Sequence, residues 1–395
     1  MNIYYTTGYA GTGKSTKLLE LLGKLKPSSS VVICPTHKAI KRLLDSGEVN
    51  IECKTIHSLL GWIPTINEDA QHISHIDSTA KLNKPLDFYT DIVIDEAGMM
   101  SEDMLTEITS RLEELHNFET DSVTLHLFLD PYQLLPVKGR QIQLDPDTTT
   151  NLTVQYRAES KDIVDCYTKF VHYLEGKNKD DLSTPHSENI KPFNLAKFKQ
   201  GDRLLAYTNE AVGEWNKKIA MELNIDGYEG QDVQLGSKLD LVRCLEFVDN
   251  VSPYCLKNAF ENGDLILQNS QINKKWLDKA MSDLYYNPYI RFIMDDNKKM
   301  YPVIVGIGKA NIVLREAKEE ALKDRSKFSD VYTLGRAFIM DYSFATTVHK
   351  SQGSEFDTVF IDKEDVQKSI FKNNFLNYAR LMYVAISRTK KTLYI

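Results

Sequence analysis

Short apolar runs alternate with amphipathic stretches through the first 150 residues of the chain. After the first of these runs, leucines at positions 18, 19, 22 and 25 are spaced for one face of a helix. Strands that alternate with helices in this way predict a parallel α/β sheet. The predicted strands are Ile3–Thr6, Val31–Cys34, Asp91–Ile94 and Leu125–Leu129.

The rest of the chain repeats this pattern with two interruptions. Residues 61–88 have a polar centre and are predicted to form an inserted hairpin or subdomain. A second α/β pattern opens near Asn151, includes a strand at Leu204–Tyr207, and returns over 332–395. Between its two parts, short strands and turn signals predict a small β-rich insertion that ends in a charged amphipathic helix at 316–323.

We therefore expect an α/β fold with two parallel-sheet domains in tandem. Residues 1–150 would form the first domain, with 61–88 as its insertion. Residues 151–225 and 329–395 would form the second domain, and 226–328 a small β-rich domain inserted in it.

Composition and charge narrow the class of protein only slightly. The chain is 42% apolar and 26% charged, which is typical of globular proteins, and no run of about 20 apolar residues suggests a membrane span. Five scattered cysteines and a start without signal-peptide features predict a cytoplasmic location, bacterial or in a phage's host. The net charge of -7 does not exclude nucleic acid, because binding depends on where basic residues lie.

The segment Gly8–Ser15 satisfies the phosphate-loop pattern G-x-x-x-x-G-K-[ST]. A predicted strand precedes it and a predicted helix follows it, which opposes a chance match in a glycine-rich turn. Lys14 would reach the β- and γ-phosphates of ATP, and Ser15 would bind Mg²⁺. The remaining predicted nucleotide contacts of this segment are Gly8, Gly11, Thr12, Gly13 and Thr16.

Two carboxylates follow the predicted strand at Asp91–Ile94. Asp95 at the end of that strand would bind Mg²⁺, and Glu96 would polarise the attacking water. Such a pair taken alone is more often a solvated loop, but with the phosphate loop it predicts a nucleotide-hydrolysing site. Nucleotide kinases share both features, so this step predicts only an NTPase.

An ordered series of further motifs resembles the superfamily 1 DNA helicases of the RecD/Dda-like type. The resemblance implies two RecA-like motor domains, a hairpin insertion in the first and a small β-barrel insertion in the second. After the phosphate loop, the matching segments are Pro35–Arg42, Thr55–Leu60, Asp95–Gly98, Leu129–Val137, Leu152–Arg157, Ala206–Asn209, Ala345–Phe356 and Tyr383–Thr389.

This resemblance implies further residues around the nucleotide. Gln133 would sense the γ-phosphate, although a lone glutamine in such a turn more often caps the backbone. Arg157 and Arg388 would be arginine fingers from the second domain, with surface salt bridges as the alternative. Gly353 would allow close approach to the phosphates, and Glu355 would contact the ribose.

The resemblance also implies a path for a single strand across both domains. Asn209 could instead be only a helix cap, and His57 and His349 could be structural. The basic helix after position 36 could be a solvated face. Trp62 or His72 could present a ring to the duplex junction, or serve as a core aromatic. The predicted strand contacts are Thr36, His37, Lys38, Thr55, His57, Asn209, Thr347 and His349.

We therefore predict an ATP-dependent DNA helicase that moves 5′ to 3′ along single-stranded DNA and opens duplex junctions. The polarity is implied by the resemblance alone. The alternatives are a translocase that remodels protein–DNA complexes and a DNA-binding regulatory module with vestigial ATPase. We expect ATP and Mg²⁺ as cofactors, a monomer, no membrane, and replication or recombination proteins as partners.

One departure from the family concerns the base. Relatives carry a glutamine upstream of the phosphate loop that reads adenine, whereas here the loop starts at Gly8. The sequence therefore predicts a weaker preference for ATP over other nucleotides than relatives have.

Overall fold

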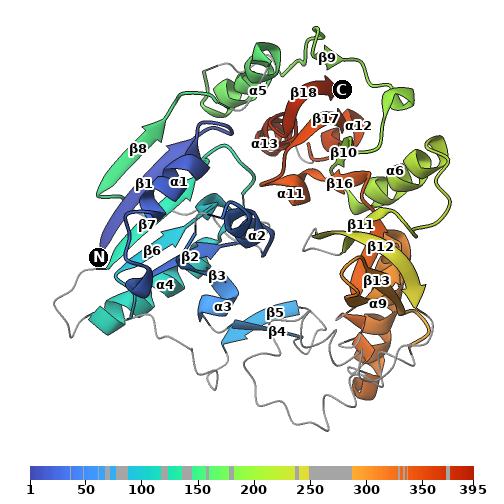
Figure 1. Ribbon diagram of the computed structural model, residues 1–395, viewed down its shortest axis with the longest axis horizontal. Coiled ribbons are helices and arrows are strands. Elements are labelled where there is room, and N and C mark those ends of the chain that lie inside the picture. Colours follow the sequence, from blue (N-terminus) through green and yellow to red (C-terminus); the bar gives the residue numbers. More distant parts are fainter. Residues whose placement is uncertain are drawn as a thin grey trace.

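The computed structural model describes residues 1–35, 37–47, 49–60, 62–66, 72–76, 88–116, 123–135, 145–156, 160–177, 182–235, 240–248, 287–327, 330–331, 334–335, 337–370 and 374–395. The described elements follow an arc. A first α/β sheet leads to a second one, and a barrel stands at the far end (Figure 1).

The first sheet has six parallel strands in the order β3-β2-β6-β7-β1-β8. Its central strands are almost wholly buried, as their continuous apolar runs predict. The strands are β1 (Asn2–Gly8), β2 (Ser30–Cys34), β3 (Glu52–Thr55), β6 (Asp91–Ile94), β7 (Thr124–Leu129) and β8 (Thr148–Leu152).

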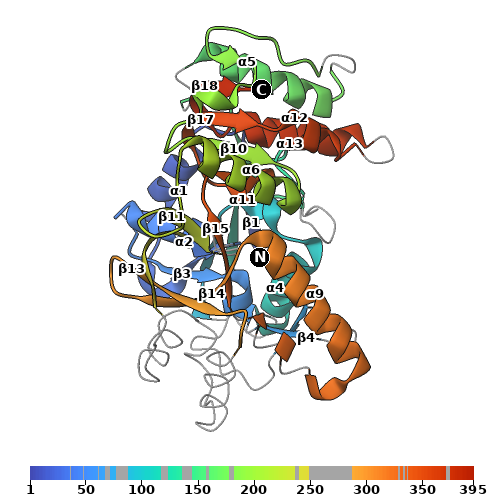
Figure 2. The same cartoon turned by 90° about the vertical axis from the view of Figure 1, so that its right-hand side faces the viewer.

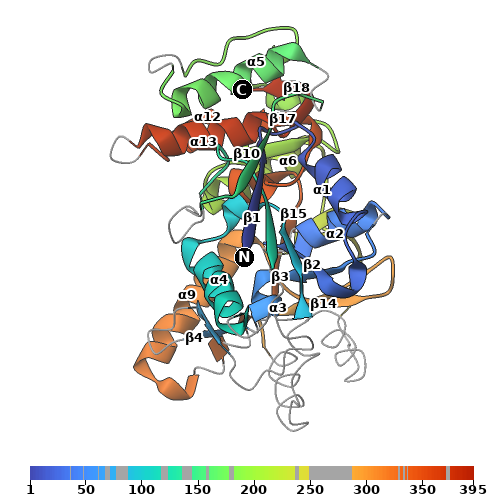
Figure 3. The ribbon, with the colours of Figure 1, turned by 90° about the vertical axis from the view of Figure 1, so that its left-hand side faces the viewer.

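Helices cover both faces of this sheet. Helices α1 (Lys14–Leu22) and α2 (His37–Asp45) pack on one face. Helices α3 (Ile56–Leu60) and α4 (Glu102–His116) pack on the other. Figure 3 shows α1 and α2 on one side of the strands and α4 on the other.

The first sheet extends further along the chain than the sequence predicted, because it includes the edge strand β8. The edge strand β8 pairs with β1 and continues the first sheet to Leu152, where a second α/β pattern was expected to open. Its sequence, Thr-Thr-Thr-Asn-Leu, is polar because four of its five side chains are exposed, so no apolar run reveals it. The inserted hairpin consists of the antiparallel strands β4 (Trp62–Ile66) and β5 (His72–Ile76). The side chains of Trp62 and His72 lie outside the described residues.

The second sheet has five parallel strands in the order β16-β10-β17-β18-β9. Helices α5 (Lys161–Leu174) and α13 (Phe375–Ile386) pack on one face, and α6 (Asn209–Glu222) packs on the other. The short helices α11 (Val348–Ser351) and α12 (Lys363–Gln367) follow strand ends. The strands are β9 (Ile190–Lys191), β10 (Arg203–Ala206), β16 (Ala345–Thr347), β17 (Phe356–Ile361) and β18 (Thr389–Tyr394).

A closed five-stranded barrel follows the second sheet in Figure 1. It takes its last strand from beyond residue 328, because β14 and β15 pair in parallel and need a crossover between them. That crossover contains α9 (Ile307–Lys323), which begins earlier than the charged stretch at 316–323 and lies beside the barrel in Figure 2. The strands are β11 (Asp232–Leu235), β12 (Asp240–Val248), β13 (Arg291–Asp295), β14 (Met300–Val305) and β15 (Phe338–Tyr342).

Within the described residues, no helix combines the length and the apolar character that crossing a membrane requires.

Candidate nucleotide site and strand-contacting positions

The phosphate loop joins β1 to α1 and depends on glycine at three positions. Gly11 and Gly13 adopt left-handed backbone conformations, with φ of 82° and 85°, and Gly13 is the N-cap of α1. A Cβ atom on Gly8 would lie 2.8 Å from the backbone oxygen of Leu152 on β8. The side chain of Thr12 is buried and donates to the carbonyl of Tyr9 at 2.9 Å. The loop therefore holds one shape, with the N-terminus of α1 open to an anion.

Lys14 is turned back onto its own loop. Its Nζ donates to the carbonyl oxygens of Gly8 at 2.6 Å and Tyr9 at 2.7 Å. It also lies 3.6 Å from Oδ2 of Asp130, whose side chain is fully buried. The ammonium group is thus held by acceptors that phosphate oxygens would have to replace.

The predicted magnesium-associated carboxylates lie two strands away from the loop. Asp95 is buried at the end of β6, and its Oδ1 accepts from the backbone N–H of Glu96 at 3.0 Å. Glu96 has a left-handed φ of 52° and opens a 3-10 turn at Ala97–Met99. Strands β6, β7 and β1 are parallel neighbours, so Asp95 and the loop both lie at the edge formed by the carboxyl ends of the strands. Ser15 and Thr16 are exposed at the start of α1, and oxygen donors of this kind fit Mg²⁺.

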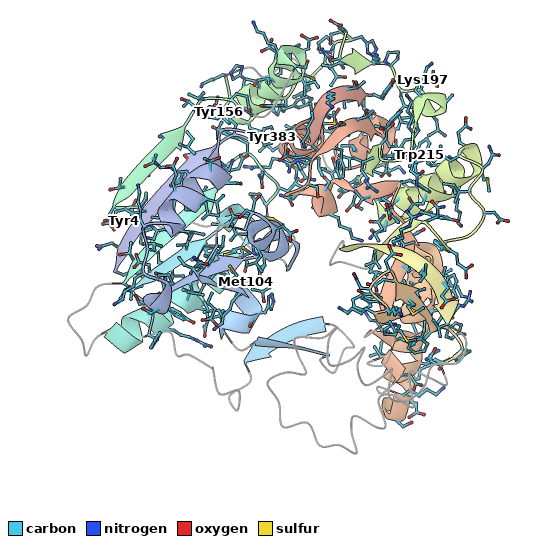
Figure 4. The ribbon with its side chains drawn as sticks, viewed as in Figure 1. Tyr4, Met104, Tyr156, Lys197, Trp215 and Tyr383 are labelled. Atoms are coloured by element: carbon cyan, nitrogen blue, oxygen red, sulfur yellow. The ribbon has the colours of Figure 1, made fainter. Side chains whose placement is uncertain are left out.

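Groups from the second domain reach this edge. The hydroxyl of Tyr383 on α13 donates to Oδ2 of Asp130 at 2.6 Å and accepts from the backbone N–H of Ala10 at 2.7 Å. Nη1 of Arg380, also on α13, donates to the carbonyls of Pro131 and Gln133 at 2.7 Å each. Figure 4 labels Tyr383 where the two α/β domains meet.

The predicted sensor Gln133 lies within this contact. Its side chain is buried, and its Nε2 is 3.5 Å from Oδ2 of Asp130. Its Oε1 accepts from Nε2 of Gln352 in the second domain at 3.5 Å. Gln133 therefore touches both a strand-end carboxylate and the segment that holds Gly353.

The two predicted arginine fingers are Arg157 and Arg388. Arg157 lies outside the described residues. Arg388 is buried, and its guanidinium donates to the Val384 carbonyl at 3.1 Å and to the Ser354 carbonyl at 3.4 Å. It thereby supports the turn in which Gly353 has a left-handed φ of 72°. In the same turn, Glu355 pairs with Lys390 at 3.6 Å.

Three residues around the site had no role in the sequence prediction: Asp130, Tyr156 and Tyr383. Tyr156 is 75% exposed, its backbone N–H donates to the Gly11 carbonyl at 2.8 Å, and its ring lies 3.5 Å from where a Cβ on Gly13 would be. Figure 4 shows it near the end of β8. Asp130 follows β7 as Asp95 follows β6, and that signal was available in the sequence.

The predicted strand-contacting threonines cap short helices at strand ends. Thr55 accepts from the Ser58 N–H at 3.3 Å at the start of α3, and Thr347 accepts from the Lys350 N–H at 3.2 Å at the start of α11. Thr208 caps α6 in the same way, so Asn209 is the exposed first residue of that helix rather than its cap. The three helices follow β3, β16 and β10.

The histidines of the same motifs are half-buried. Burial lowers the pKa of both His57 and His349, so both are neutral at pH 7. The His349 ring lies 6.1 Å from the ring of Tyr207. Thr36 and the side chains of His37 and Lys38 lie outside the described residues, although α2 itself begins at His37.

Comparisons with known families match both α/β domains. Residues 2–139 match the family described as an AAA domain, and residues 342–395 match the UvrD-like helicase C-terminal domain. The first match contains the phosphate loop, Asp95 and Gln133, and the second contains His349 and Arg388.

Individual relatives match over nearly the whole chain. The RecBCD enzyme subunit RecD of Buchnera aphidicola is 23% identical over 99% of this chain and 70% of its own length. An uncharacterized protein of Methanocaldococcus jannaschii is also 23% identical, but the chain spans only 36% of that protein's length.

Two solved structures have a similar fold. The Pif1 helicase from Candida albicans aligns over 100% of this chain and 90% of its own, with a TM-score of 0.55 and 18% identity. Bacteroides Pif1 bound to single-stranded DNA aligns over 100% and 88%, with a TM-score of 0.52 and 16% identity.

Proposed function

Since this chain belongs to the superfamily 1 helicases of the RecD/Pif1 type, we propose that it is an ATP-driven motor that moves along single-stranded DNA and separates duplexes. The observation that carries this proposal is the contact between Tyr383 of the second α/β domain and both Ala10 and Asp130 of the first. A nucleotide site bounded by two domains can convert the binding and release of nucleotide into motion of one domain relative to the other.

In this proposal, the residues of the first domain bind and orient ATP. Lys14 leaves its carbonyl acceptors for the phosphates, and the amides at the start of α1 complete the cradle. Ser15 and Asp95 would hold Mg²⁺, which neutralises charge on the phosphates. Glu96 would orient the attacking water, and Gln133 would sense the γ-phosphate.

We assign the remaining nucleotide contacts to three segments. Arg157 and Arg388 would supply positive charge from the second domain, with Gly353 and Glu355 on the same side. The exposed ring of Tyr156 beside Gly13 offers a face on which a base can stack. Stacking of that kind accepts any base, which supports the expected weak preference for ATP.

The proposed strand path crosses the carboxyl ends of β3, β10 and β16. Thr55, His57, Asn209, Thr347 and His349 lie there at helix starts, where N–H groups favour phosphates. Thr36, His37 and Lys38 would extend the path from β2. The solved structure of Bacteroides Pif1 with single-stranded DNA is consistent with such a strand on this fold.

We propose the expected division into two motor domains and a small β-rich domain, with β8 assigned to the first domain and β15 to the β-rich domain. We also propose that the protein acts as a monomer with replication or recombination partners. The 5′-to-3′ direction rests on the family resemblance.

Strand displacement on tailed duplexes tests this proposal. DNA and RNA duplexes with a 5′ or a 3′ tail are incubated with ATP and Mg²⁺, and we expect displacement from the 5′-tailed DNA alone. ATP hydrolysis stimulated by single strands without any displacement would favour the protein-removing translocase. A Lys14→Ala variant that kept full biological activity would favour the regulatory module.

A further inference from the structure

The carboxylate of Asp130 links the phosphate loop to the second domain. It is fully buried, and it accepts from the hydroxyl of Tyr383 at 2.6 Å and from the backbone N–H of Tyr132 at 3.0 Å. Two further groups lie near it, Nε2 of Gln133 at 3.5 Å and the ammonium group of Lys14 at 3.6 Å. A buried carboxylate needs such donors, because an unpartnered charge in the interior is costly.

Lys14 therefore has two competing sets of acceptors. It now contacts Asp130 and the carbonyls of Gly8 and Tyr9, but phosphate binding requires it to turn toward the nucleotide. When it turns, Asp130 loses the ammonium group at 3.6 Å, and the cation that remains near it is the Arg380 guanidinium on α13, which donates to the carbonyls of Pro131 and Gln133. The free-energy cost of losing Lys14 depends on the hydrogen-bond donors that remain in contact with the Asp130 carboxylate.

The hydroxyl of Tyr383 is placed to limit this cost. Its side chain is fully buried, with its ring 5.8 Å from that of Tyr167 and 6.4 Å from that of Tyr132. Burial first, and then the charge of Asp130, raise the pKa of Tyr383 well above its usual value, so the hydroxyl keeps its proton and donates. The same oxygen accepts from Ala10, which fixes it against the loop.

We propose that Tyr383 is a positioning residue whose hydroxyl stabilises Asp130 so that Lys14 can leave it for the phosphates of the nucleotide. This inference rests on the proposed ATP site. It adds a direct consequence for coupling, because the group that compensates for Lys14 belongs to α13 of the second domain. Binding of the nucleotide to the first domain is thereby coupled to helix α13 of the second domain.

The test measures the equilibrium affinity of the full chain for a fluorescent ATP analogue with Mg²⁺. In Tyr383→Phe the ring stays and the hydroxyl is removed, and we expect the affinity to fall roughly tenfold, since a hydrogen bond to a charged group is lost. Tyr378→Phe is the matched control. Tyr378 is a buried tyrosine on the same helix that packs against Phe170, and its change is expected to leave the affinity within about twofold of wild type.

Rescue separates this role from a packing defect. Asp130→Asn keeps an acceptor for the Tyr132 N–H but removes the charge that holds Lys14. The double variant Tyr383→Phe/Asp130→Asn should therefore bind the analogue more tightly than Tyr383→Phe alone, and Asp130→Asn alone should bind it more tightly than wild type. The second comparison remains decisive if Tyr383→Phe does not fold.

Unchanged affinity in Tyr383→Phe, or no gain from Asp130→Asn in either background, would overturn the inference. A wild-type chain that binds the analogue but shows no hydrolysis stimulated by single strands would instead contradict the proposed motor, and it would leave this comparison intact.

Discussion

At the residue scale, Tyr156 is the side chain whose position most changes the expected nucleotide site. Its exposed ring lies against Gly13 at the start of α1, and its backbone is tied to Gly11. We expect Tyr156→Ala to raise the half-saturating concentration of ATP about tenfold, because a base–aromatic stack contributes about 1–3 kcal/mol. Steady-state hydrolysis with ATP and GTP measures this, and both should be affected alike.

The neighbouring Val154→Ala is the control, since Val154 is also exposed but has no ring to offer. Equal half-saturation for wild type and Tyr156→Ala would show that the base is held elsewhere.

The residues of local motifs could be predicted, whereas those that join the domains could not. Short sequence patterns at strand ends predict the roles of Gly8, Lys14 and Asp95, because the residues that form each pattern are close together both in sequence and in space. Tyr383 and Asp130 are 253 positions apart, and neither carries a local signal that pairs it with the other. Only the packing of α13 against the loop after β7 brings them together.

At the element scale, Asp365 positions the segment that leads into α6. Its Oδ2 accepts from the backbone N–H groups of Tyr207 and Thr208 at 2.7 Å each, and Oδ1 accepts from the Thr208 hydroxyl at 3.0 Å. Burial would raise the pKa of Asp365, but the hydrogen bonds from Thr208, Lys368 and Tyr207 outweigh it and lower the pKa below its usual value. The carboxylate on α12 thus fixes the turn that presents Asn209.

We expect Asp365→Ala to reduce the affinity for single-stranded DNA and to destabilise the protein by about 1–3 kcal/mol, because buried donors lose their acceptor. Binding to a labelled oligonucleotide and denaturant unfolding measure the two effects. The exposed Glu364 on the same helix supplies the control variant Glu364→Ala. Unaltered strand binding by a destabilised Asp365→Ala would remove Asn209 and its turn from the strand path.

Elements with an apolar pattern were predictable, and those without one were not. The predicted run Asp91–Ile94 is β6 itself, because a buried parallel strand has to be apolar on both faces. The edge strand β8 escaped prediction because its side chains are exposed. Helix α9 was predicted only over its charged second half, since its first half packs beside the barrel.

At the scale of the whole molecule, His57 and His349 make stability depend on pH. Burial lowers the pKa of both, so in the folded state they bind protons less readily than in the unfolded state. Their contribution is fully present above the ordinary histidine pKa of about 6.5 and is lost as the pH falls below it. We therefore expect the thermal unfolding midpoint to fall between pH 7 and pH 5.

The double variant His57→Gln/His349→Gln should flatten this dependence, whereas His186→Gln, at an exposed position, should leave it as in wild type. An equally steep dependence in the double variant would show that other groups cause it.

The central claim is that the two α/β domains form one nucleotide site whose turnover is governed by a bound strand. The most direct measurement is the rate of ATP hydrolysis with and without single-stranded DNA of mixed sequence, for wild type and for Lys14→Ala. The account predicts that the strand accelerates hydrolysis in wild type and that Lys14→Ala hydrolyses almost nothing in either condition. A folded wild-type chain whose hydrolysis responds to neither single-stranded DNA nor RNA would contradict it.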